Sequence, residues 1–244
     1  MRIAALLVVA CLTAGPAAAQ SVLPDIGGIS LGGDAALATR SIQLIALLTV
    51  LSLVPGLAVM VTCFPFIVTV LSILRQAIGL QQSPPNMLIV SLALFLTWFV
   101  MDPVFTEAWT NGVEPLAAGR LTIDAAIPAT LAPFRVFMAA RLDPDTFEAL
   151  RALRPGLDSG PLPDAPLSLL VPSFLLSEIQ RAFEIGFLIF LPFLIIDLVV
   201  AAVLMSMGMM MVPPAIVSMP FKLAFFVVAD GWSLISGALV RSYS

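Results

Sequence analysis

Two residues of opposite charge, Asp197 and Lys222, lie inside apolar stretches in the last quarter of this 244-residue chain. A charge near the centre of a bilayer costs roughly 2.5 to 3.5 kcal/mol on insertion scales, so each of them needs a partner. A methionine-rich run separates them, and the midpoint of the two positions falls within it. If the chain reverses there, both residues lie roughly 18 Å from the turn at the standard rise of a helix. We therefore expect Asp197 and Lys222 to pair at the same height.

The role of the Asp197–Lys222 pair has two interpretations. In the simpler one, the pair only locks a single hairpin. We prefer an interpretation in which it also connects neighbouring subunits. Asp230 adds a third charge to the same stretch, and a helix interrupted in this way is a poor lipid-facing span.

Three more charges, Glu178, Arg181 and Glu184, recur at a helical spacing. Such a pattern is typical of a solvated helix face, on which Glu178 and Arg181 pair for a few tenths of a kcal/mol. The alternative is a charge-pairing role for Glu178 between subunits, with Lys222 as its candidate partner. The sequence leaves both interpretations open.

Methionines gather at the expected chain reversal, at positions 207, 209, 210 and 211. Pro213 disfavours helix in the residue before it, and Gly208 favours a left-handed helix cap. Because methionine is unbranched and polarizable, a cluster at a turn suits a deformable seal around a passing chain. The alternative is soft packing against the core or lipid. We prefer the seal, and predict that Met207, Met209, Met210 and Met211 form a channel gasket.

The composition restricts the classes of function. Hydrophobic residues make up 60% and charged residues 11% of the chain, against about 25% charged in soluble domains, which indicates an integral membrane protein. There is no histidine, and the two cysteines, Cys11 and Cys63, do not suggest a disulfide framework. No phosphate loop, metal cluster or nucleophile arrangement is recognisable. We expect no catalytic residue, no metal, no cofactor and no nucleic-acid partner.

The N-terminus has the pattern of a secretory signal: a basic residue, an apolar core, a Gly-Pro break and three alanines. We predict a signal peptide over residues 1–19, cleaved between Ala19 and Gln20. A lipoprotein cleavage at Cys11 is the weaker alternative, because its apolar core would be very short. Residues 20–40 are rich in Gly, Ser and Ala, and we expect them to be flexible.

The remaining chain predicts an all-α membrane protein built from two helical hairpins with Pro-Pro turns and a small helical soluble insert. The first hairpin covers 41–105, the extracytoplasmic insert 106–172, and the C-terminal hairpin with the Met-rich loop 173–244. The shared plan of the hairpins suits either a transporter's duplicated structure or two unrelated hairpins. With the N-terminus outside, the four apolar stretches predict four crossings. This topology places Arg75 and Lys222 toward the cytoplasm and the net acidic insert outside, which fits the positive-inside rule.

Some segments carry more detailed expectations. Residues 41–74 are free of charge, and as one helix they would reach about 50 Å, beyond a hydrocarbon core of about 30 Å. We expect a break at Pro55-Gly56 or at Pro65. In the insert, 131–142 is an amphipathic helix, and a second helix begins at Asp143-Pro144. The proline-rich stretch 155–172 favours an extended connection. A helix over 174–187 places Leu175, Ile179 and Phe183 opposite its charged residues.

Several motifs in the C-terminal hairpin resemble the FliP family of flagellar biosynthetic proteins. They are Pro172–Phe187, Pro192–Leu198, Met207–Pro214, Pro220–Leu223 and Asp230–Trp232, together with the earlier Ser83–Asn86 and Ala93–Thr97. The resemblance runs from the signal peptide to the C-terminus. Ser173 stands where alanine is common in the pattern. Injectisome counterparts are the nearest relatives, and the long insert favours the flagellar form.

The resemblance implies a core pore-forming subunit of the flagellar type III protein export gate, in the bacterial inner membrane at the basal body. It implies a ring-like assembly of about five copies with FliQ and FliR, through which unfolded flagellar subunits pass. The gasket of the family maps onto Met209, Met210 and Met211. The family's assembly also lies largely above the bilayer, which makes the four crossings only a description of hydropathy. Two alternatives from the residues stay open: a secondary transporter for a small solute, with Asp197 as the coupling carboxylate, and a non-conducting scaffold of a membrane complex.

Overall fold

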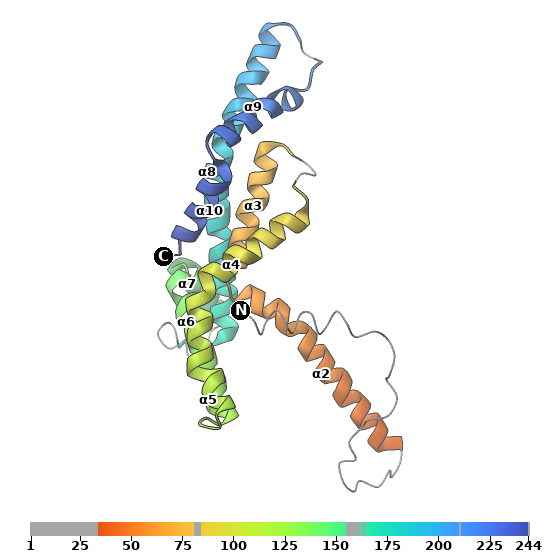
Figure 1. Ribbon diagram of the computed structural model, residues 1–244, viewed down its shortest axis with the longest axis vertical. Helices are drawn as coiled ribbons and strands as arrows, with labels where there is room; N and C mark the ends of the chain where they lie inside the picture. The colour runs from red at the N-terminus through yellow and green to blue at the C-terminus, as the bar shows by residue number, and fades with distance from the viewer. Residues whose placement is uncertain (1–33, 81–83, 155–161, 163, 210, 244) are drawn as a thin grey trace. The chain divides into compact units, whose positions relative to one another are not determined.

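The described part of the chain consists of helices. The computed structural model describes residues 34–80, 84–154, 162, 164–209 and 211–243. Its helices are α2 (Asp34–Met60), α3 (Phe64–Ile78), α4 (Asn86–Ala108), the π-helix η1 (Trp109–Val113), α5 (Glu114–Ala117), α6 (Ile123–Arg141), α7 (Pro144–Ala152), α8 (Leu167–Ser206), α9 (Pro214–Val228) and α10 (Gly231–Arg241). Figure 1 shows these helices and, among the residues described, no strand. The all-α fold class is therefore confirmed.

The chain divides into two compact units, Met1–Leu48 and Thr49–Ser244. Helix α2 contains the boundary between them. In the first unit the structure describes only the N-terminal part of α2, where the side chains that it describes are exposed. The predicted signal peptide, with its cleavage between Ala19 and Gln20, lies outside the described residues. So does most of the predicted flexible segment 20–40, whose last residues form the first turns of α2.

The charge-free stretch breaks between α2 and α3, next to Pro65 and not at Pro55. Helix α2 continues through Pro55 and ends before a short turn, and Pro65 lies in the first turn of α3. A proline is tolerated there because the N–H groups of a first turn lack helical partners anyway. The Thr62 hydroxyl closes the turn by donating to the Val59 carbonyl at 2.7 Å and accepting from the Phe64 N–H at 3.3 Å.

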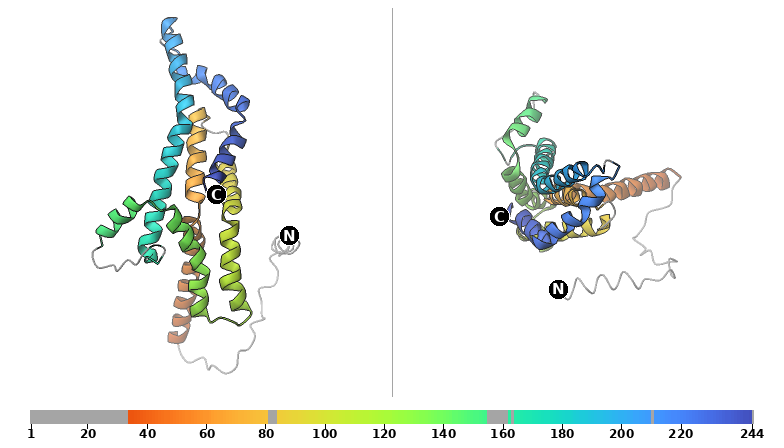
Figure 2. Two further views of the ribbon diagram at one scale, coloured as in Figure 1. Left: turned by 90° about the vertical axis from the view of Figure 1, so that its left-hand side faces the viewer. Right: turned by 90° about the horizontal axis from the view of Figure 1, so that it is seen from above.

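Helix α3 forms the centre of the second unit. It runs beside α8 and against α4, as Figures 1 and 2 show. The contact with α8 is close because Gly186 has no side chain: a Cβ there would lie 2.4 Å from Cδ1 of Ile73. The face of α3 that these neighbours cover includes the fully buried Phe66, Ile67, Val70, Leu71 and Leu74.

The predicted insert contains a second helical hairpin. Helix α4 continues past the expected boundary at residue 105, and η1 and α5 lead to α6, which returns beside α4. A Cβ at Gly112 of η1 would lie 2.8 Å from Cα of Thr130, so glycine permits this approach. Helix α6 begins at Ile123, well before the expected residue 131, and runs through Pro128 and Pro133.

Helix α7 begins where the sequence predicts, after Asp143. The Asp143 carboxylate caps the helix by accepting from the Thr146 N–H at 2.9 Å and from the Thr146 hydroxyl at 2.7 Å. These hydrogen bonds lower the pKa of Asp143, because they favour the charged carboxylate. The cap starts a helix that packs Phe147 into a small core with Met138, Leu142 and Phe174.

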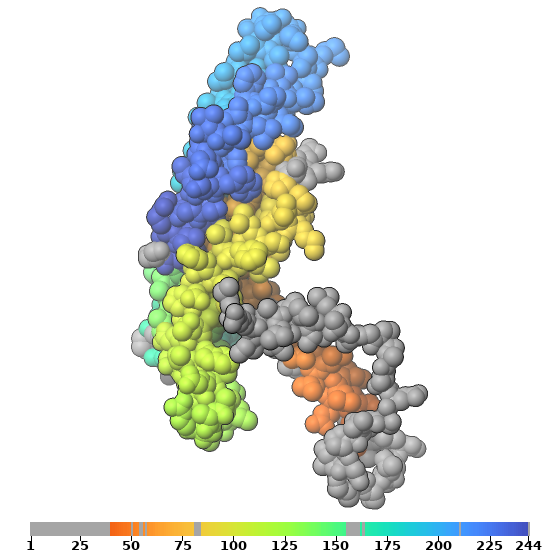
Figure 3. All heavy atoms as spheres, viewed as in Figure 1, coloured from red at the N-terminus to blue at the C-terminus, as the bar shows by residue number. Residues whose placement is uncertain are grey.

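Helix α8 is longer than expected. It joins the predicted helix over 174–187 and the first apolar arm of the C-terminal hairpin in one continuous helix. Its 40 residues run from Leu167 through Pro172 and Pro192, so the expected extended connection ends earlier and the boundary at 172 to 173 lies inside a helix. At the standard rise it is about 60 Å long. After the reversal, α9 and α10 meet at a bend of 62°. Figure 3 shows both helices on one flank; α10 contacts α4, and α9 contacts α8 and α3.

Four helical segments of the described chain are long and apolar enough to cross a membrane, or up to five if the bent pair of α9 and α10 counts as one span. They are 40–60, 86–117, 123–141 and 167–206. One of them, 123–141, lies in the region predicted to be a soluble insert. Its two prolines and its flanking charges resemble a connecting segment, although its mean hydropathy of 1.3 is that of a candidate span.

Candidate functional site

The C-terminal hairpin positions the charged residues. Helix α8 ends at Ser206, α9 begins at Pro214, and α9 folds back beside the last part of α8. Figure 2 shows the reversal between them at one end of the second unit, beyond the end of α3. The part of this hairpin next to α3 carries the predicted pair.

The structure joins Asp197 and Lys222 in an ion pair across the hairpin. Lys222 Nζ donates to Asp197 Oδ2 at 2.6 Å and to the Ala77 carbonyl oxygen of α3 at 3.1 Å. The other carboxylate oxygen, Oδ1, accepts from the Ser218 hydroxyl at 2.5 Å. Lys222 is only 5% exposed, whereas the Asp197 side chain is 31% exposed. The ammonium is therefore the more costly charge to leave alone, and it has two oxygen partners.

This arrangement fixes three helices relative to one another. The pair holds α8 and α9 in register, and the Ala77 carbonyl ties both to the C-terminal end of α3. Removing one partner of a buried pair typically costs 3 to 5 kcal/mol, because the other charge is left uncompensated. The equal height that the sequence predicts for the two residues agrees with this geometry. A link between subunits is not part of the single chain.

A cavity of about 810 Å³ opens beside the pair. Asp197 and Lys222 contribute to its wall together with Arg75 of α3. The Arg75 guanidinium also donates to the side-chain oxygen of Asn86, at the start of α4. Two cations and one carboxylate therefore face the same space.

The methionine turn lies beyond the pair and is exposed. Met207, Met209 and Met211 are 66%, 42% and 98% exposed, and Met210 lies outside the described residues. Gly208 adopts a left-handed conformation with φ of 75°. Its N–H donates to the Met205 carbonyl at 3.0 Å, which ends α8 in the manner of a glycine cap. The turn thus presents flexible apolar side chains to its surroundings and not to the core.

An apolar groove of about 570 Å³ lies between the two arms of the hairpin. Its lining residues include Val203 and Leu204 of α8, Val217 and Phe221 of α9, and Met209 of the turn. The arms between the ion pair and the turn are therefore not closely packed against each other.

Glu178 lies in the core and not on a solvated helix face. It is 0% exposed, and its Oε1 accepts from Arg141 Nε at 3.2 Å. Its second oxygen accepts from the Tyr243 hydroxyl. Arg141 also donates to the Ser242 carbonyl at 2.7 Å and lies 4.0 Å from the centre of the Tyr243 ring. Within this chain the ion-pair partner of Glu178 is thus Arg141 and not Arg181.

The buried face of α8 differs from the expected one at Glu178 and Phe183, whereas Leu175 and Ile179 are half-buried. Ser173 and Ser177 accompany Glu178 inside, and their hydroxyls donate to carbonyls one turn earlier. Phe183, expected on the packed face, is 61% exposed, and Glu184 is exposed with Gln180 as a hydrogen-bond donor. Ser177 faces the start of α7, where its hydroxyl accepts from the Asp143 N–H at 2.9 Å, and Gly186 lets α8 approach α3. An apolarity pattern alone does not reveal these contacts.

Sequence reasoning missed Arg141, Ser218 and Tyr243 as members of these networks. Ser218 stands four residues before Lys222, one helical turn away, and this spacing was an available signal. Arg141 approaches Glu178 from α6 and Tyr243 from the turn after α10, so no local pattern marks them. Among the described residues no group of three or more potential metal ligands occurs.

Fold and site together define an all-helical membrane protein whose C-terminal hairpin holds a buried ion pair below an exposed methionine turn. The model of the FliP family matches residues 47–239 of this chain. A Caulobacter vibrioides protein named flagellar biosynthetic protein FliP is 49% identical over 246 residues, covering 99% of this chain and 91% of the relative. Proteins of the same name are 43% identical in Rhizobium meliloti, over 100% of this chain and 99% of the relative, and 43% identical in Bacillus subtilis, over 84% and 93%. The chain belongs to the FliP family of flagellar biosynthetic proteins, which confirms the family expected from its motifs.

Proposed function

We propose that this chain is a core pore-forming subunit of the flagellar type III protein export gate in the bacterial inner membrane. About five copies surround a channel together with FliQ and FliR, and unfolded flagellar subunits pass through it. Family membership over nearly the full length supports this assignment. The observation that carries it is the exposed methionine turn held at a fixed height by a buried ion pair.

The methionine turn is the gasket of the channel. Met211 is 98% exposed, and an apolar side chain so far from its own core gains contacts only from another molecule. Thioether side chains repack around partners of varied shape, which suits a seal that closes behind a passing polypeptide. Met207 and Met209 lie on the same turn and share this role, and Met210, which follows Met209 in the sequence, completes the set.

The ion pair sets the position of the gasket. Lys222 and Asp197 fix the register of α8 and α9, so the turn between them projects to the same level in every copy. In a ring assembly every subunit uses the same interface. The methionine turns of all copies therefore lie at the same height and form a continuous ring. The outer face of α8, with Leu176 at 47% and Phe187 at 62% exposed, is apolar surface for neighbours or lipid.

The mass of the complex purified in detergent tests the assembly. A ring gate predicts a particle several times heavier than this 25.8 kDa chain, in which other membrane proteins copurify. The measurement is native mass spectrometry of the complex extracted from flagellated cells. A monomer or dimer that takes up a small solute would support the transporter instead and would contradict the proposal.

A further inference from the structure

Exposed thioether sulfur gathers at the methionine turn. Met207, Met209 and Met211 stand within five positions of one another, and all three are exposed. Met101 and Met138, in contrast, lie in the core and are 0% and 1% exposed. An oxidant must contact the sulfur atom of a methionine to react with it, so exposure decides which methionines are oxidised. The turn therefore offers several reactive sulfur atoms at one place.

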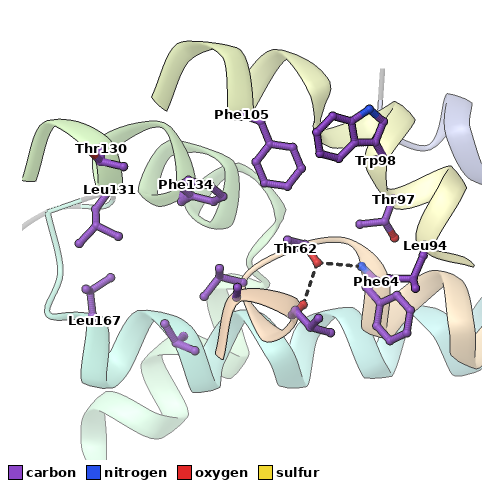
Figure 4. Close-up of a pocket in the computed structure, with 14 residues that line it drawn as sticks. Thr62, Phe64, Leu94, Thr97, Trp98, Phe105, Thr130, Leu131, Phe134 and Leu167 are labelled. Carbon is purple, nitrogen blue, oxygen red and sulfur yellow. Dashed lines mark hydrogen bonds between the residues drawn. The ribbon is translucent and has the colours of Figure 1, made fainter. Parts of the chain in front are cut away.

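Other sulfur atoms and cavities of the described chain compete little with the turn. Cys63 is fully buried, and burial raises the pKa of its thiol to about 12, so the reactive thiolate is scarce at neutral pH. Figure 4 shows a cavity of about 740 Å³ between α4, α6 and the start of α8, whose described lining residues include no methionine and no cysteine. The groove between the arms of the C-terminal hairpin is lined by Met207 and Met209. Small oxidants that enter this groove meet thioethers.

Oxidation of these side chains leaves the hairpin intact. Backbone hydrogen bonds close the turn: the Gly208 N–H donates to the Met205 carbonyl at 3.0 Å, and the Met209 N–H donates to the Leu204 carbonyl at 2.9 Å. No thioether takes part in these two bonds. The pair of Lys222 and Asp197 holds the register of the arms and contains no sulfur. A sulfoxide at the turn thus adds a polar oxygen to an apolar surface without removing the contacts that position it.

We propose that the methionine turn is a reversible oxidation site, at which peroxides open the seal. The O–O bond of hydrogen peroxide breaks, one oxygen bonds to the thioether sulfur, and the other leaves as water. The sulfur loses two electrons and the peroxide gains them. The sulfoxide is a polar group that needs a hydrogen-bond partner, so an oxidised seal admits water where thioethers exclude it. Methionine sulfoxide reductases restore the thioether, which makes the change reversible.

This site rests on the proposed function, because only a seal turns the modification into a leak. A gasket around a passing chain faces the channel, so peroxide that enters the channel reaches its thioethers. Met87 provides the comparison outside the turn: it is 81% exposed at the start of α4, and its oxidation changes no part of the seal.

Peroxide treatment of the assembled complex in planar bilayers tests the site. Hydrogen peroxide is added, the conductance is recorded, and mass spectrometry of peptides gives the sulfoxide content of each methionine. We expect Met207, Met209 and Met211 to oxidise roughly tenfold faster than Met101 and Met138, because oxidation follows exposure. The conductance should rise with this oxidation and fall again when the reductases for both sulfoxide epimers are added. Oxidised turn methionines without a rise in conductance would overturn the proposal, and so would turn methionines that react no faster than Met101.

Two sets of leucine substitutions locate the sulfur that responds. Met87→Leu removes an exposed thioether outside the turn, and we expect the full response to peroxide. Met207, Met209, Met210 and Met211 are replaced together by leucine, which has a similar volume and no sulfur. We expect the conductance of this variant to stay at its own untreated level when peroxide is added. A quadruple variant that responds like the unsubstituted protein would contradict the proposal.

The outcomes separate this site from the gasket. If the quadruple variant does not assemble, the peptide mapping and the reversal by the reductases decide. Replacement of Met209, Met210 and Met211 by alanine tests the gasket without any oxidant. A leaking alanine variant together with an unsubstituted complex that stays closed in peroxide refutes the oxidation site alone. An alanine variant that does not leak refutes the gasket itself.

Discussion

At the scale of single residues, the buried charges of the described residues, Lys222 and Glu178, are each held by partners from more than one segment of the chain. Lys222 of α9 meets Asp197 of α8 and a carbonyl of α3, and Glu178 of α8 meets Arg141 of α6 and Tyr243 near the C-terminus. Such networks stabilise only when every member is present, because each lost partner leaves a charge without compensation. Their main effect is to define one arrangement of the helices.

Asp197→Leu tests the pair directly. The variant leaves Lys222 with the Ala77 carbonyl alone, and we expect a loss of about 3 to 5 kcal/mol together with loss of the assembled complex. The exchange Asp197→Lys with Lys222→Asp restores the pair but places a carboxylate near that carbonyl, so recovery is partial. The measurement is the yield of complex and swimming motility.

Asp230→Asn is the control, since Asp230 is exposed and asparagine tolerates its left-handed φ of 47°. Full activity of Asp197→Leu would contradict the role of the pair.

Glu178 and Glu184 form a matched comparison on one helix. Glu178→Ala leaves the Arg141 guanidinium without its carboxylate, and we expect about 3 to 5 kcal/mol of destabilisation. Glu184→Ala removes an exposed carboxylate, and we expect a change within about 0.5 kcal/mol. Unfolding followed by circular dichroism in detergent measures both. Equal effects would show that Glu178 is not the buried partner described here.

Alkaline pH should destabilise the fold through two acids, the buried Cys63 and the half-buried Tyr243. Burial raises the pKa of the Cys63 thiol from 9.0 to about 12, and burial together with the Glu178 carboxylate raises the pKa of Tyr243 above its ordinary 10.0. Between pH 9 and pH 12 the unfolded chain loses protons that the folded chain keeps, so stability falls as pH rises, by at most about 1.4 kcal/mol per pH unit for each group. Unfolding measured from pH 8 upward should show this slope, reduced in Cys63→Ala and Tyr243→Phe. An unchanged slope in both variants would refute this origin.

At the scale of elements, glycines decide how closely the helices approach. Gly112 faces backbone atoms of Thr130, whereas Gly186 faces the flexible end of the Ile73 side chain. A backbone cannot move aside as a side-chain methyl can, so the two positions differ in what they tolerate. Both contacts bring apolar helices together without large side chains between them.

Three substitutions to alanine separate these effects. We expect Gly112→Ala to cost about 1 to 3 kcal/mol through overpacking, and Gly186→Ala to cost less because Ile73 can change its rotamer. Gly56→Ala meets nothing within 4 Å and should stabilise α2 by about 0.5 to 1 kcal/mol. Thermal unfolding of the three variants gives the order. A Gly186→Ala loss larger than that of Gly112→Ala would contradict the packing described.

At the scale of the whole molecule, the sequence predicts what depends on local chemistry. The cost of a membrane charge, the cap at Asp143 and the cap at Gly208 were sufficient to predict the hairpin, its turn and the start of α7. It was harder to predict where the helices continue without a break. The apolar helices α2 and α8 pass through Pro55 and Pro172, whereas helices of soluble proteins usually end at a proline. The networks around Glu178 depend on residues from distant segments, and a single sequence carries no local sign of such contacts.

The central claim is that the methionine turn seals a channel, and ion leakage through the assembled complex tests it most directly. Met209, Met210 and Met211 are replaced together by alanine, and Met205→Ala serves as the control because Met205 is 61% exposed on α8 just before the turn. The measurement is the conductance of the complex in planar bilayers or the entry of small molecules into cells that produce it. We predict that the triple variant leaks and that Met205→Ala stays closed. A triple variant as tight as the unsubstituted protein would contradict the gasket and favour a scaffold.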